Sequence, residues 1–249
     1  MKILSLNAWG GVIYEPLINF IKEQQAVDIF CFQEILFGKE AEFTTQFKAR
    51  KNLCTELQAI LSEYDVYMSW HQDADFFENE PLIGTPYGQA IFYKKNITCL
   101  EQGFFACCEG YQNSSGGKVT GRCQWIKFNY NGSDLYLLNL HGLSQIDTFK
   151  KDTEERIIQS KTLLKFIDQK NTVLIGDYNL APETKSMQML EQGLRNLIST
   201  YNITNTRSSL YKKEPRFADY CLLSNQVKEK SFSVLNVEVS DHLPLLLEI

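Results

Sequence analysis

Long apolar runs are absent from this chain of 249 residues. No run approaches the ~20 residues that a helix needs to cross a bilayer, so we expect no transmembrane segment. Met1-Lys2 leads straight into an alternating segment, without the apolar stretch and cleavage site of a secretory leader. We therefore expect a cytoplasmic protein, although a leader removed before residue 1 would leave no trace in this sequence.

A cysteine framework and an excess of basic residues are also missing. The seven cysteines are odd in number, and their spacing matches neither a set of pairs nor a zinc site. Most lie inside apolar runs, where cysteine acts as a small hydrophobic residue, so we expect reduced thiols in the core. The net charge of −5 does not favour a protein that coats nucleic acid nonspecifically, since such proteins usually carry a basic face.

The chain also lacks a Pro-, Gly- or Ser-rich linker and a visible internal repeat. With 44% hydrophobic residues it can bury a sizeable core, and strand-like segments alternate loosely with helix-like ones. These features predict a single domain over residues 1–249 with mixed α/β layers and buried sheets. Hydrophobic period by itself does not give the strand order.

Alternating and continuous apolar segments locate the expected elements. Strands are predicted over 2–9, 27–35, 65–70, 89–94, 124–130, 134–140, 172–176, 218–223, 232–237 and 243–249. Helices are predicted over 15–25, 43–64, 152–168 and 185–194, and Asn131-Gly132 is a hairpin turn signal. Long loops are expected at 71–88 and 101–118 as specificity elements, the first being either a substrate lid or a solvated insertion.

Five short polar segments interrupt or flank the apolar runs, and they contain two of the three histidines of the chain. They are Leu6-Asn7-Ala8-Trp9, Phe32-Gln33-Glu34, Asn139-Leu140-His141-Gly142, Gly176-Asp177-Tyr178-Asn179 and Ser240-Asp241-His242. The first four follow a strand-like run and the last precedes one. Because buried polar groups are costly without partners, we expect these segments to meet in one site built from strand ends.

The residue types suit metal-assisted hydrolysis of a phosphate ester, which requires a cation, an activated water and stabilisation of the leaving oxygen. Mg²⁺ prefers oxygen ligands, usually one or two carboxylates with several waters. Glu34 fits as the principal ligand because it stands at the end of an apolar run. Asn7 and Asp241 are plausible neighbours of the ion, which we expect to be Mg²⁺, with Mn²⁺ as an alternative.

Asp177 and Asn179 are two residues apart and would point to the same face of an extended segment. The carboxylate can then accept a proton from water while the amide donates to a phosphate oxygen. His242 needs a partner that fixes its tautomer, and Asp219 is the candidate. His141 could donate to a non-bridging oxygen.

Each of these segments also has a purely structural explanation. Asp177 and Asn179 are residue types that favour turns, Ser240-Asp241-His242 could cap a loop, and Glu34 could be an exposed strand end. The joint occurrence of all five segments argues against this structural explanation.

The order Leu-Asn, Gln-Glu, Asn-x-His, Gly-Asp-x-Asn and Ser-Asp-His resembles the endonuclease/exonuclease/phosphatase superfamily. This superfamily includes DNase I, exonuclease III-type abasic-site endonucleases, deadenylases, inositol-polyphosphate 5-phosphatases and neutral sphingomyelinases. The match runs from Asn7 to His242, which is essentially the whole chain. Gly176-Asp177-Tyr178-Asn179 with Ser240-Asp241-His242 is its specific part.

The resemblance implies an α/β four-layer sandwich, with two mixed β-sheets face to face flanked by helices. It also implies Mg²⁺ at Glu34 with Asn7 and Asp241 close by. His141 matches a position where the DNase I and sphingomyelinase branches carry His, whereas abasic-site endonucleases usually have a Tyr-containing pattern there. An abasic-site activity is therefore less expected.

The resemblance also implies roles for the remaining polar residues. Asp177 would position or deprotonate the attacking water, and Asn179 would orient the phosphate. His242, paired with Asp219, would stabilise or protonate groups around the transition state.

The superfamily pattern does not fix the substrate, which could be nucleic acid, a lipid head group or an inositol phosphate. Asn7-Ala8-Trp9-Gly10 resembles the start of neutral sphingomyelinases, and Phe76-Phe77 and Phe104-Phe105 are candidate apolar tips for that branch. A phosphorylated or nucleic-acid substrate would need cations. Lys118 and Arg122 are the candidates, and the alternative group is Arg207, Lys212, Lys213 and Arg216.

We therefore predict a Mg²⁺-dependent hydrolase of phosphodiester or phosphomonoester bonds. Nuclease activity is slightly favoured over a phospholipase-C-like activity, and an inositol-phosphate phosphatase is a further alternative. A catalytically silent binding module on the same fold is the alternative of another class, but such a module has no reason to keep the full set of acids and amides. No protein partner can be inferred from the sequence.

Overall fold

The first crossover unit follows directly from the apolar pattern at the N-terminus. β1 (Lys2–Asn7) and β2 (Ile29–Leu36) are buried almost throughout, and α1 (Tyr14–Glu23) connects them with Pro16 in its first turn. The two strands pair in parallel, with Asn7 opposite Gln33 at their carboxyl ends. The crossover thus sets the predicted polar segments of β1 and β2 side by side at one sheet edge.

A second crossover unit repeats this arrangement. β9 (Ser133–His141) and β10 (Thr172–Asp177) pair in parallel through α3 (Glu154–Ile167), with His141 opposite Asp177. Strands with apolar residues on both faces are typical of parallel pairs that are covered on both sides. The carboxyl ends of this pair again carry predicted site residues.

Each parallel pair forms the centre of a six-stranded sheet whose other strands are antiparallel. The first sheet has the order β13-β14-β1-β2-β6-β3, and its outer strands are β13 (Ser231–Val234), β14 (Leu245–Glu248), β6 (Tyr87–Lys94) and β3 (Tyr64–His71). The second sheet has the order β11-β12-β10-β9-β8-β7, and its outer strands are β11 (Arg195–Asn196), β12 (Asp219–Leu223), β8 (Lys118–Tyr130) and β7 (Cys99–Gln112). A short hairpin pairs β4 (Phe76–Phe77) with β5 (Glu80–Pro81).

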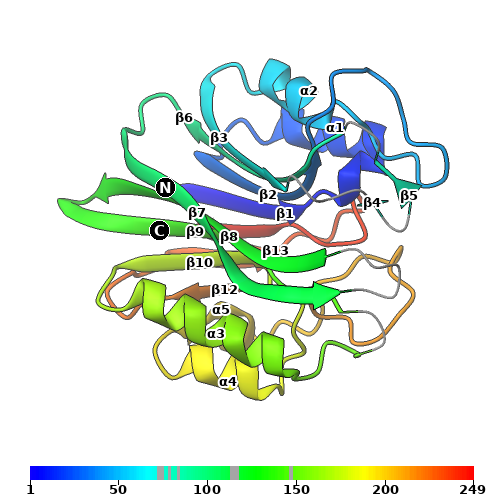
Figure 1. Ribbon diagram of the computed structural model, residues 1–249. Coiled ribbons are helices and arrows are strands. Elements are labelled where there is room, and N and C mark those ends of the chain that lie inside the picture. The colour runs from blue at the N-terminus through cyan, green and yellow to red at the C-terminus, as the bar shows by residue number, and fades with distance from the viewer. Residues whose placement is uncertain (72–75, 78–79, 83–84, 113–117, 146–147) are drawn as a thin grey trace.

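The structure, a computed structural model, describes residues 1–71, 76–77, 80–82, 85–112, 118–145 and 148–249. The two sheets pack face to face, with α1 and α2 (Leu53–Ile60) on one outer side (Figure 1). α3, α4 (Lys185–Glu191) and the short α5 (Leu197–Thr200) lie on the other. The predicted sandwich of two mixed sheets flanked by helices is therefore confirmed.

Two of the sequence predictions are wrong in extent. Residues 101–118 are mostly strand rather than loop. β7, which the sequence analysis did not predict, pairs with β8 in a long antiparallel ladder, and β8 begins at Lys118 rather than at residue 124. The helix predicted over 43–64 covers only α2; Phe43 instead bridges Arg50, and Ala49 packs with Leu36 in a small separate cluster. Tertiary packing outweighed the helical spacing in that segment.

The proposed apolar tips are largely packed. Phe77 is buried and Phe105 stacks on Phe166 at 4.7 Å between ring centroids, whereas the Phe104 ring is exposed. The side chain of Phe76, like much of the predicted loop 71–88, lies outside the described residues.

The hairpin turn and the thiols agree with the sequence. Asn131 and Gly132 both have positive φ and connect β8 to β9. None of the seven cysteines, all of which the structure describes, forms a disulfide, and six of them are buried. In the part of the chain that the structure describes, none of the helices is long and apolar enough to span a membrane.

Candidate active site

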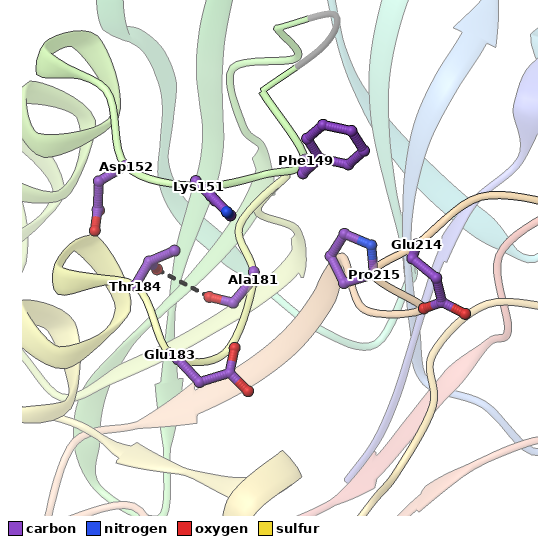
Figure 2. Close-up of a pocket in the computed structure, with 8 residues that line it drawn as sticks. All are labelled: Phe149, Lys151, Asp152, Ala181, Glu183, Thr184, Glu214 and Pro215. Atoms are coloured by element: carbon purple, nitrogen blue, oxygen red, sulfur yellow. Dashed lines mark hydrogen bonds between the residues drawn. The ribbon is translucent and has the colours of Figure 1, made fainter.

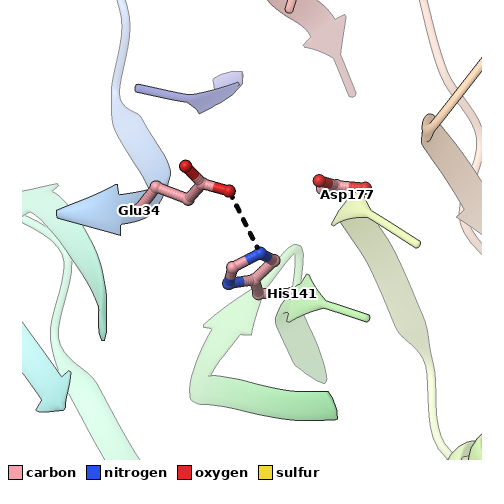
Figure 3. Close-up of side chains that lie close together, drawn as sticks. All are labelled: Glu34, His141 and Asp177. Atoms are coloured by element: carbon pink, nitrogen blue, oxygen red, sulfur yellow. Dashed lines mark ion pairs between the residues drawn. The ribbon is translucent and has the colours of Figure 1, made fainter. Parts of the chain in front are cut away.

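The four carboxyl ends of the two parallel strand pairs meet in one polar cluster. Asn7 ends β1, Glu34 lies near the end of β2, His141 ends β9 and Asp177 ends β10. Ligand atoms of Glu34, His141 and Asp177 all lie within 4.8 Å of one another, and Figure 3 shows these three side chains converging from three strands. Ligands generally bind at the carboxyl ends of parallel strands, and here both sheets contribute such ends.

Glu34 reaches the cluster because β2 is irregular at this residue. The pairing of β2 with β6 shifts register between Phe32 and Ile35, and Glu34 has a φ of 56°. Bulges of this kind redirect a side chain near functional sites. The Glu34 side chain is only 18% exposed and forms an ion pair with His141 at 3.5 Å, so it is not the exposed strand end that the structural explanation required.

The Glu34–His141 pair is electrostatically coupled. Burial would raise the pKa of Glu34, but His141 and the Asn7 amide outweigh it and hold that pKa below its usual value. Burial would likewise lower the pKa of His141, but Glu34 and Asp177 keep it above its usual value. The carboxylate and the imidazolium therefore stabilise each other's charged forms.

The Gly-Asp-Tyr-Asn segment has a local reason for each residue. A Cβ on Gly176 would lie 2.2 Å from the carbonyl oxygen of Leu140, so only glycine allows β10 to approach β9 this closely. Tyr178 is fully buried and donates its hydroxyl to the Leu174 carbonyl. Asp177 and Asn179 alternate with these two packed residues and are left for the site.

Asn179 is not extended as the sequence analysis assumed, because its φ is 53°. Asp177 Oδ1 accepts the backbone N–H of Asn179 at 2.9 Å, and this hydrogen bond forms an Asx turn. The Asn179 amide still faces the carboxylate, at 3.4 Å from Asp177 Oδ2, and donates to the Gly142 carbonyl at 3.2 Å. The segment is thus both a turn and part of the cluster.

Asp219 and His242 form the predicted pair. His242 Nδ1 lies 2.8 and 2.9 Å from the two Asp219 carboxylate oxygens, and both side chains are buried. Burial and Arg207 act to lower the pKa of His242, but Asp219, Asp241 and Asp177 outweigh them and raise it. His242 Nε2 is left facing Asp177 and Asp241, each at 3.7 Å.

The Thr206-Arg207 segment forms a backbone strap that positions the terminal Ser-Asp-His segment. Arg207 forms an isolated antiparallel bridge with His242, and the Arg207 guanidinium Nη1 donates to Asp241 Oδ2 at 2.7 Å. Thr206 Oγ1 accepts the backbone N–H groups of Ala218 and Asp219 at 3.1 and 3.3 Å. The strap therefore fixes the two partners of the Asp219–His242 pair relative to each other, a role that the sequence analysis missed.

A buried network of polar side chains connects the two sheets next to the strand ends that form the site. Gln33 Nε2 donates to Asn139 Oδ1 at 2.5 Å and to Ser5 Oγ at 3.2 Å. Asn139 Nδ2 donates to Gln124 Oε1 at 3.2 Å, and Gln89 Nε2 donates to the Asn139 carbonyl at 2.7 Å. These five residues come from β1, β2, β9, β8 and β6. Gln33 directly precedes Glu34, and Ser5 and Asn139 lie two residues before Asn7 and His141.

Lys150 is a further residue near the site that the sequence analysis did not select. Its side chain is 8% exposed, and Nζ donates to the Phe217 carbonyl at 2.8 Å. Burial and then Arg207 lower the pKa of Lys150 to about 8, against the opposing carboxylates Asp177, Asp219 and Asp241. A lysine in a polar stretch gives no sequence signal for burial, since most lysines are exposed.

The predicted substrate-binding cations have mixed outcomes. Arg122 lies opposite His141 in the β8–β9 ladder and donates from Nε to Thr120 Oγ1 at 3.1 Å. The side chain of Lys118 lies outside the described residues. In the alternative group, Arg207 is buried against Asp241, and Arg216 donates to the backbone carbonyls of Tyr211, Arg207 and Ser208.

The donor set suits a hard divalent cation. The Glu34 and Asp177 carboxylates approach within 4.8 Å, and among the described residues their ion-pair partners are His141 and His242 alone. Two close carboxylates repel each other in a partly buried setting, and oxygen-rich groups are the ligands that Mg²⁺ prefers. The residues at the strand ends therefore fit a metal ion.

Comparisons with known proteins bear on the fold. No family model and no curated protein matches the chain. Solved structures do match. An endonuclease/exonuclease/phosphatase family protein from Leptotrichia buccalis aligns over 100% of this chain and 99% of its own, with 21% identity and a TM-score of 0.71.

Two further neighbours extend this likeness. A mannosyl-6-phosphatase from Bacteroides thetaiotaomicron aligns over 100% of this chain and 98% of its own, with 17% identity and a TM-score of 0.70. The human Nocturnin catalytic domain, with a bound sulfate anion, aligns over 99% of this chain and 92% of its own, with 16% identity and a TM-score of 0.63. The chain therefore has the DNase I-like fold of the endonuclease/exonuclease/phosphatase proteins.

Proposed function

We propose that the protein is a metal-dependent phosphoric ester hydrolase that uses Mg²⁺. The observation that carries this proposal is the meeting of Glu34, His141 and Asp177 within 4.8 Å at the carboxyl ends of the strand pairs. Endonuclease/exonuclease/phosphatase proteins and a mannosyl-6-phosphatase among the structural neighbours point in the same direction. In this proposal Glu34 and Asn7 hold the ion, with Asp241 Oδ1 nearby because Oδ2 is taken by Arg207.

Asp177 is the group that would accept a proton from the attacking water. Burial acts to raise its pKa, but His242, Arg207, His141 and Lys150 outweigh it and keep the pKa low, so the carboxylate is ionised. Asn7 and Asn179 fix its orientation through their amides. When bound, the metal supplies charge neutralisation and Lewis acidity at the phosphate.

His242 is the group that would face the phosphate oxygens. Its Nδ1 is held by Asp219, so Nε2 is the atom that donates to a phosphate or leaving oxygen. The Asn179 amide can give up its long hydrogen bond to Asp177 and donate to a phosphate oxygen instead. His141, held by Glu34, would donate to a non-bridging oxygen of the phosphate.

The nuclease preference of the sequence analysis has limited support. A nuclease requires cations along the path of the nucleic-acid backbone. Arg122 pairs with His141 in the β8–β9 ladder and donates from Nε to Thr120 Oγ1. The guanidinium groups of Arg207 and Arg216 donate to Asp241 and to backbone carbonyls. We therefore propose the hydrolase without a preference for nucleic acid.

The proposal is tested with bis-p-nitrophenyl phosphate and p-nitrophenyl phosphate, with Mg²⁺ and with EDTA. Glu34→Ala and His242→Ala should each abolish hydrolysis while circular dichroism shows a folded protein, and the exposed Glu63→Ala should remain active as the matched control. Activity in EDTA, or full activity in either site variant, would overturn the proposal. Mg²⁺ binding without turnover of any ester would instead favour the silent binding module.

The substrate class is tested with a panel under the same conditions. The panel contains single-stranded and duplex DNA, RNA, sphingomyelin and inositol polyphosphates. Preferred cleavage of nucleic acid that depends on Arg122 would restore the nuclease prediction.

A further inference from the structure

The Phe149–Lys150 turn directs a single ammonium group into the protein. Both residues have left-handed backbone conformations, with φ of 49° and 57°, which cost free energy for residues other than glycine. Phe149 and Lys151 line a hollow at the surface (Figure 2), and the Phe149 ring is 66% exposed. Lys150, between them, is only 8% exposed. The strained turn therefore buries the middle one of three side chains.

Contacts between side chains join Lys150 to the candidate active site. Lys150 Nζ lies 4.9 Å from the centre of the Tyr211 ring, and Arg207 Cζ lies 4.3 Å from the same centre. Arg207 Nη1 donates to Asp241 Oδ2 at 2.7 Å. His242 Nε2 lies 3.7 Å from Asp241 Oδ1. Each member of this series contacts the next, so Lys150 is linked to the histidine that we assign to the phosphate.

The backbone also fixes Lys150 between two segments of the site. Its carbonyl accepts the Ala181 backbone N–H at 2.9 Å, two residues beyond Asn179. Its Nζ donates to the Phe217 carbonyl at 2.8 Å, two residues before Asp219. The ammonium group is therefore held at a set position beside the site.

The charge of Lys150 is only partly satisfied by the fold. An ammonium has three donors, and among the described residues Lys150 has one hydrogen bond, to a neutral carbonyl, and no ion pair. The neighbouring Arg207 is a second buried cation, and its Nε has no hydrogen-bond partner in the described part of the chain. Burial and then Arg207 lower the pKa of Lys150 to about 8. Buried charges without a close counter-ion are costly, and an anion bound beside the two cations would offset that cost.

We propose that Lys150 binds a non-bridging oxygen of the phosphate that is hydrolysed, with Arg207 adding positive charge beside it. Asp177, the proposed proton acceptor, is the carboxylate whose charge acts most strongly on Lys150, so the ammonium lies on the side of that group. The inference rests on the proposed hydrolase, because that proposal places the phosphate. The competing explanation is that Lys150 only clamps the Phe217 carbonyl.

Phosphate binding is measured first, because it does not require turnover. Isothermal titration calorimetry with inorganic phosphate, in the presence of Mg²⁺, compares the wild type with Lys150→Met, which keeps a long unbranched side chain but removes the charge. The affinity should fall about tenfold or more, as expected for the loss of one hydrogen bond to a charged group. Lys151→Met, the same change at the exposed neighbour, should bind phosphate as the wild type does. Unchanged affinity in Lys150→Met, or an equal loss in both variants, overturns the proposal.

Further measurements separate phosphate binding from a structural clamp. A clamp would lower the melting temperature of Lys150→Met but leave the phosphate affinity of the folded protein unchanged. Lys150→Arg keeps the charge and should bind phosphate more tightly than Lys150→Met. Equal affinities of these two variants would overturn the assignment to charge. If circular dichroism shows that Lys150→Met does not fold, Lys150→Gln takes its place in the same comparisons.

Failure of the two proposals is distinguishable. In Lys150→Met, KM for p-nitrophenyl phosphate and the inhibition constant of inorganic phosphate should rise together, because the contact is made with the bound phosphate before reaction. If the wild type hydrolyses this ester and Lys150→Met keeps the wild-type KM, the hydrolase stands and the role of Lys150 falls. If no ester is hydrolysed but phosphate binding depends on Lys150, the hydrolase falls and Lys150 remains part of an anion site.

Discussion

Asn7 Nδ2 donates to Asp177 Oδ2 at 3.1 Å, although the two residues lie 170 positions apart and end strands of different sheets. The same Asn7 side chain accepts the Trp9 backbone N–H at 3.0 Å, which fixes the amide. This hydrogen bond ties the carboxyl end of one central strand pair to that of the other. It orients the carboxylate that we assign to proton transfer.

Asn7→Ala should therefore reduce activity more than it reduces stability. Loss of the donor leaves the Asp177 carboxylate oriented by Asn179 alone, and we expect kcat/KM on an aryl phosphodiester to fall roughly 10–100-fold, as for other residues that orient a metal or catalytic ligand. The melting temperature, measured on the same preparation, should fall only slightly. A variant with wild-type kcat/KM would contradict the assigned role.

Mg²⁺ should stabilise the protein through Glu34. A ligand that binds only the folded state at 100 times its dissociation constant raises the free energy of unfolding by about 2.7 kcal/mol. We expect a Mg²⁺-dependent rise in melting temperature for the wild type and for the exposed control Glu63→Gln, but not for Glu34→Gln. The same rise in all three proteins would place the ion elsewhere.

The buried amide pair of Gln33 and Asn139 should be strongly coupled. Replacement of either residue by leucine leaves polar partners buried without a hydrogen bond, which costs about 1–3 kcal/mol. The double variant should lose less than the sum of the single variants, because their shared 2.5 Å hydrogen bond is lost only once. Urea unfolding of the four proteins measures this coupling, and additive losses would show that the pair does not act as a unit.

Asp28 should contribute stability in a pH-dependent way. Its carboxylate accepts the Lys2 backbone N–H at 2.8 Å and the Lys94 ammonium at 2.9 Å. Burial acts to raise the pKa of Asp28, but these donors outweigh it and hold the pKa below its usual value. The contribution is therefore present above the unfolded value of about 3.9 and is lost as the pH falls through the lower folded value.

Asp28→Asn tests this dependence. The variant should lower the free energy of unfolding by about 1 kcal/mol or less at pH 7, and its difference from the wild type should shrink below about pH 4, as the wild-type carboxylate protonates. Denaturant unfolding at pH 7 and at pH 3 measures both values. A difference that grows on acidification would contradict the assigned direction of the pKa shift.

Sequence patterns predicted the central strands well because burial on both faces leaves a clear signature. β2 and β10 are nearly continuous apolar runs, and each carries, at or near its carboxyl end, the polar residues that the sequence analysis selected. The helix predicted over 43–64 failed because spacing alone does not distinguish a helix from a packed irregular segment. The side chains of Phe43 and Ala49 pack against residues of other segments instead.

The candidate site was predictable in composition but not in detail. The polar residues Glu34, Asp177 and His242 interrupt or border apolar runs, and a polar residue in such a place marks a site. Lys150 and Arg207 are charged residues in polar segments, so nothing in the sequence distinguishes them from solvated side chains. Their burial depends on loops that fold over the sheet edge.

The sequence by itself determined the two buried strand pairs, the polar residues at their ends and the chemistry that those residues suit, because each of these is a local property of residue type and period. Only the tertiary structure decided that the ends of both sheets meet, that Asn7 orients Asp177, and that the Phe149–Lys150 turn separates a buried cation from an exposed ring. These relationships join residues far apart in the chain, and their geometry depends on how two sheets and their loops pack together. No local pattern encodes that packing.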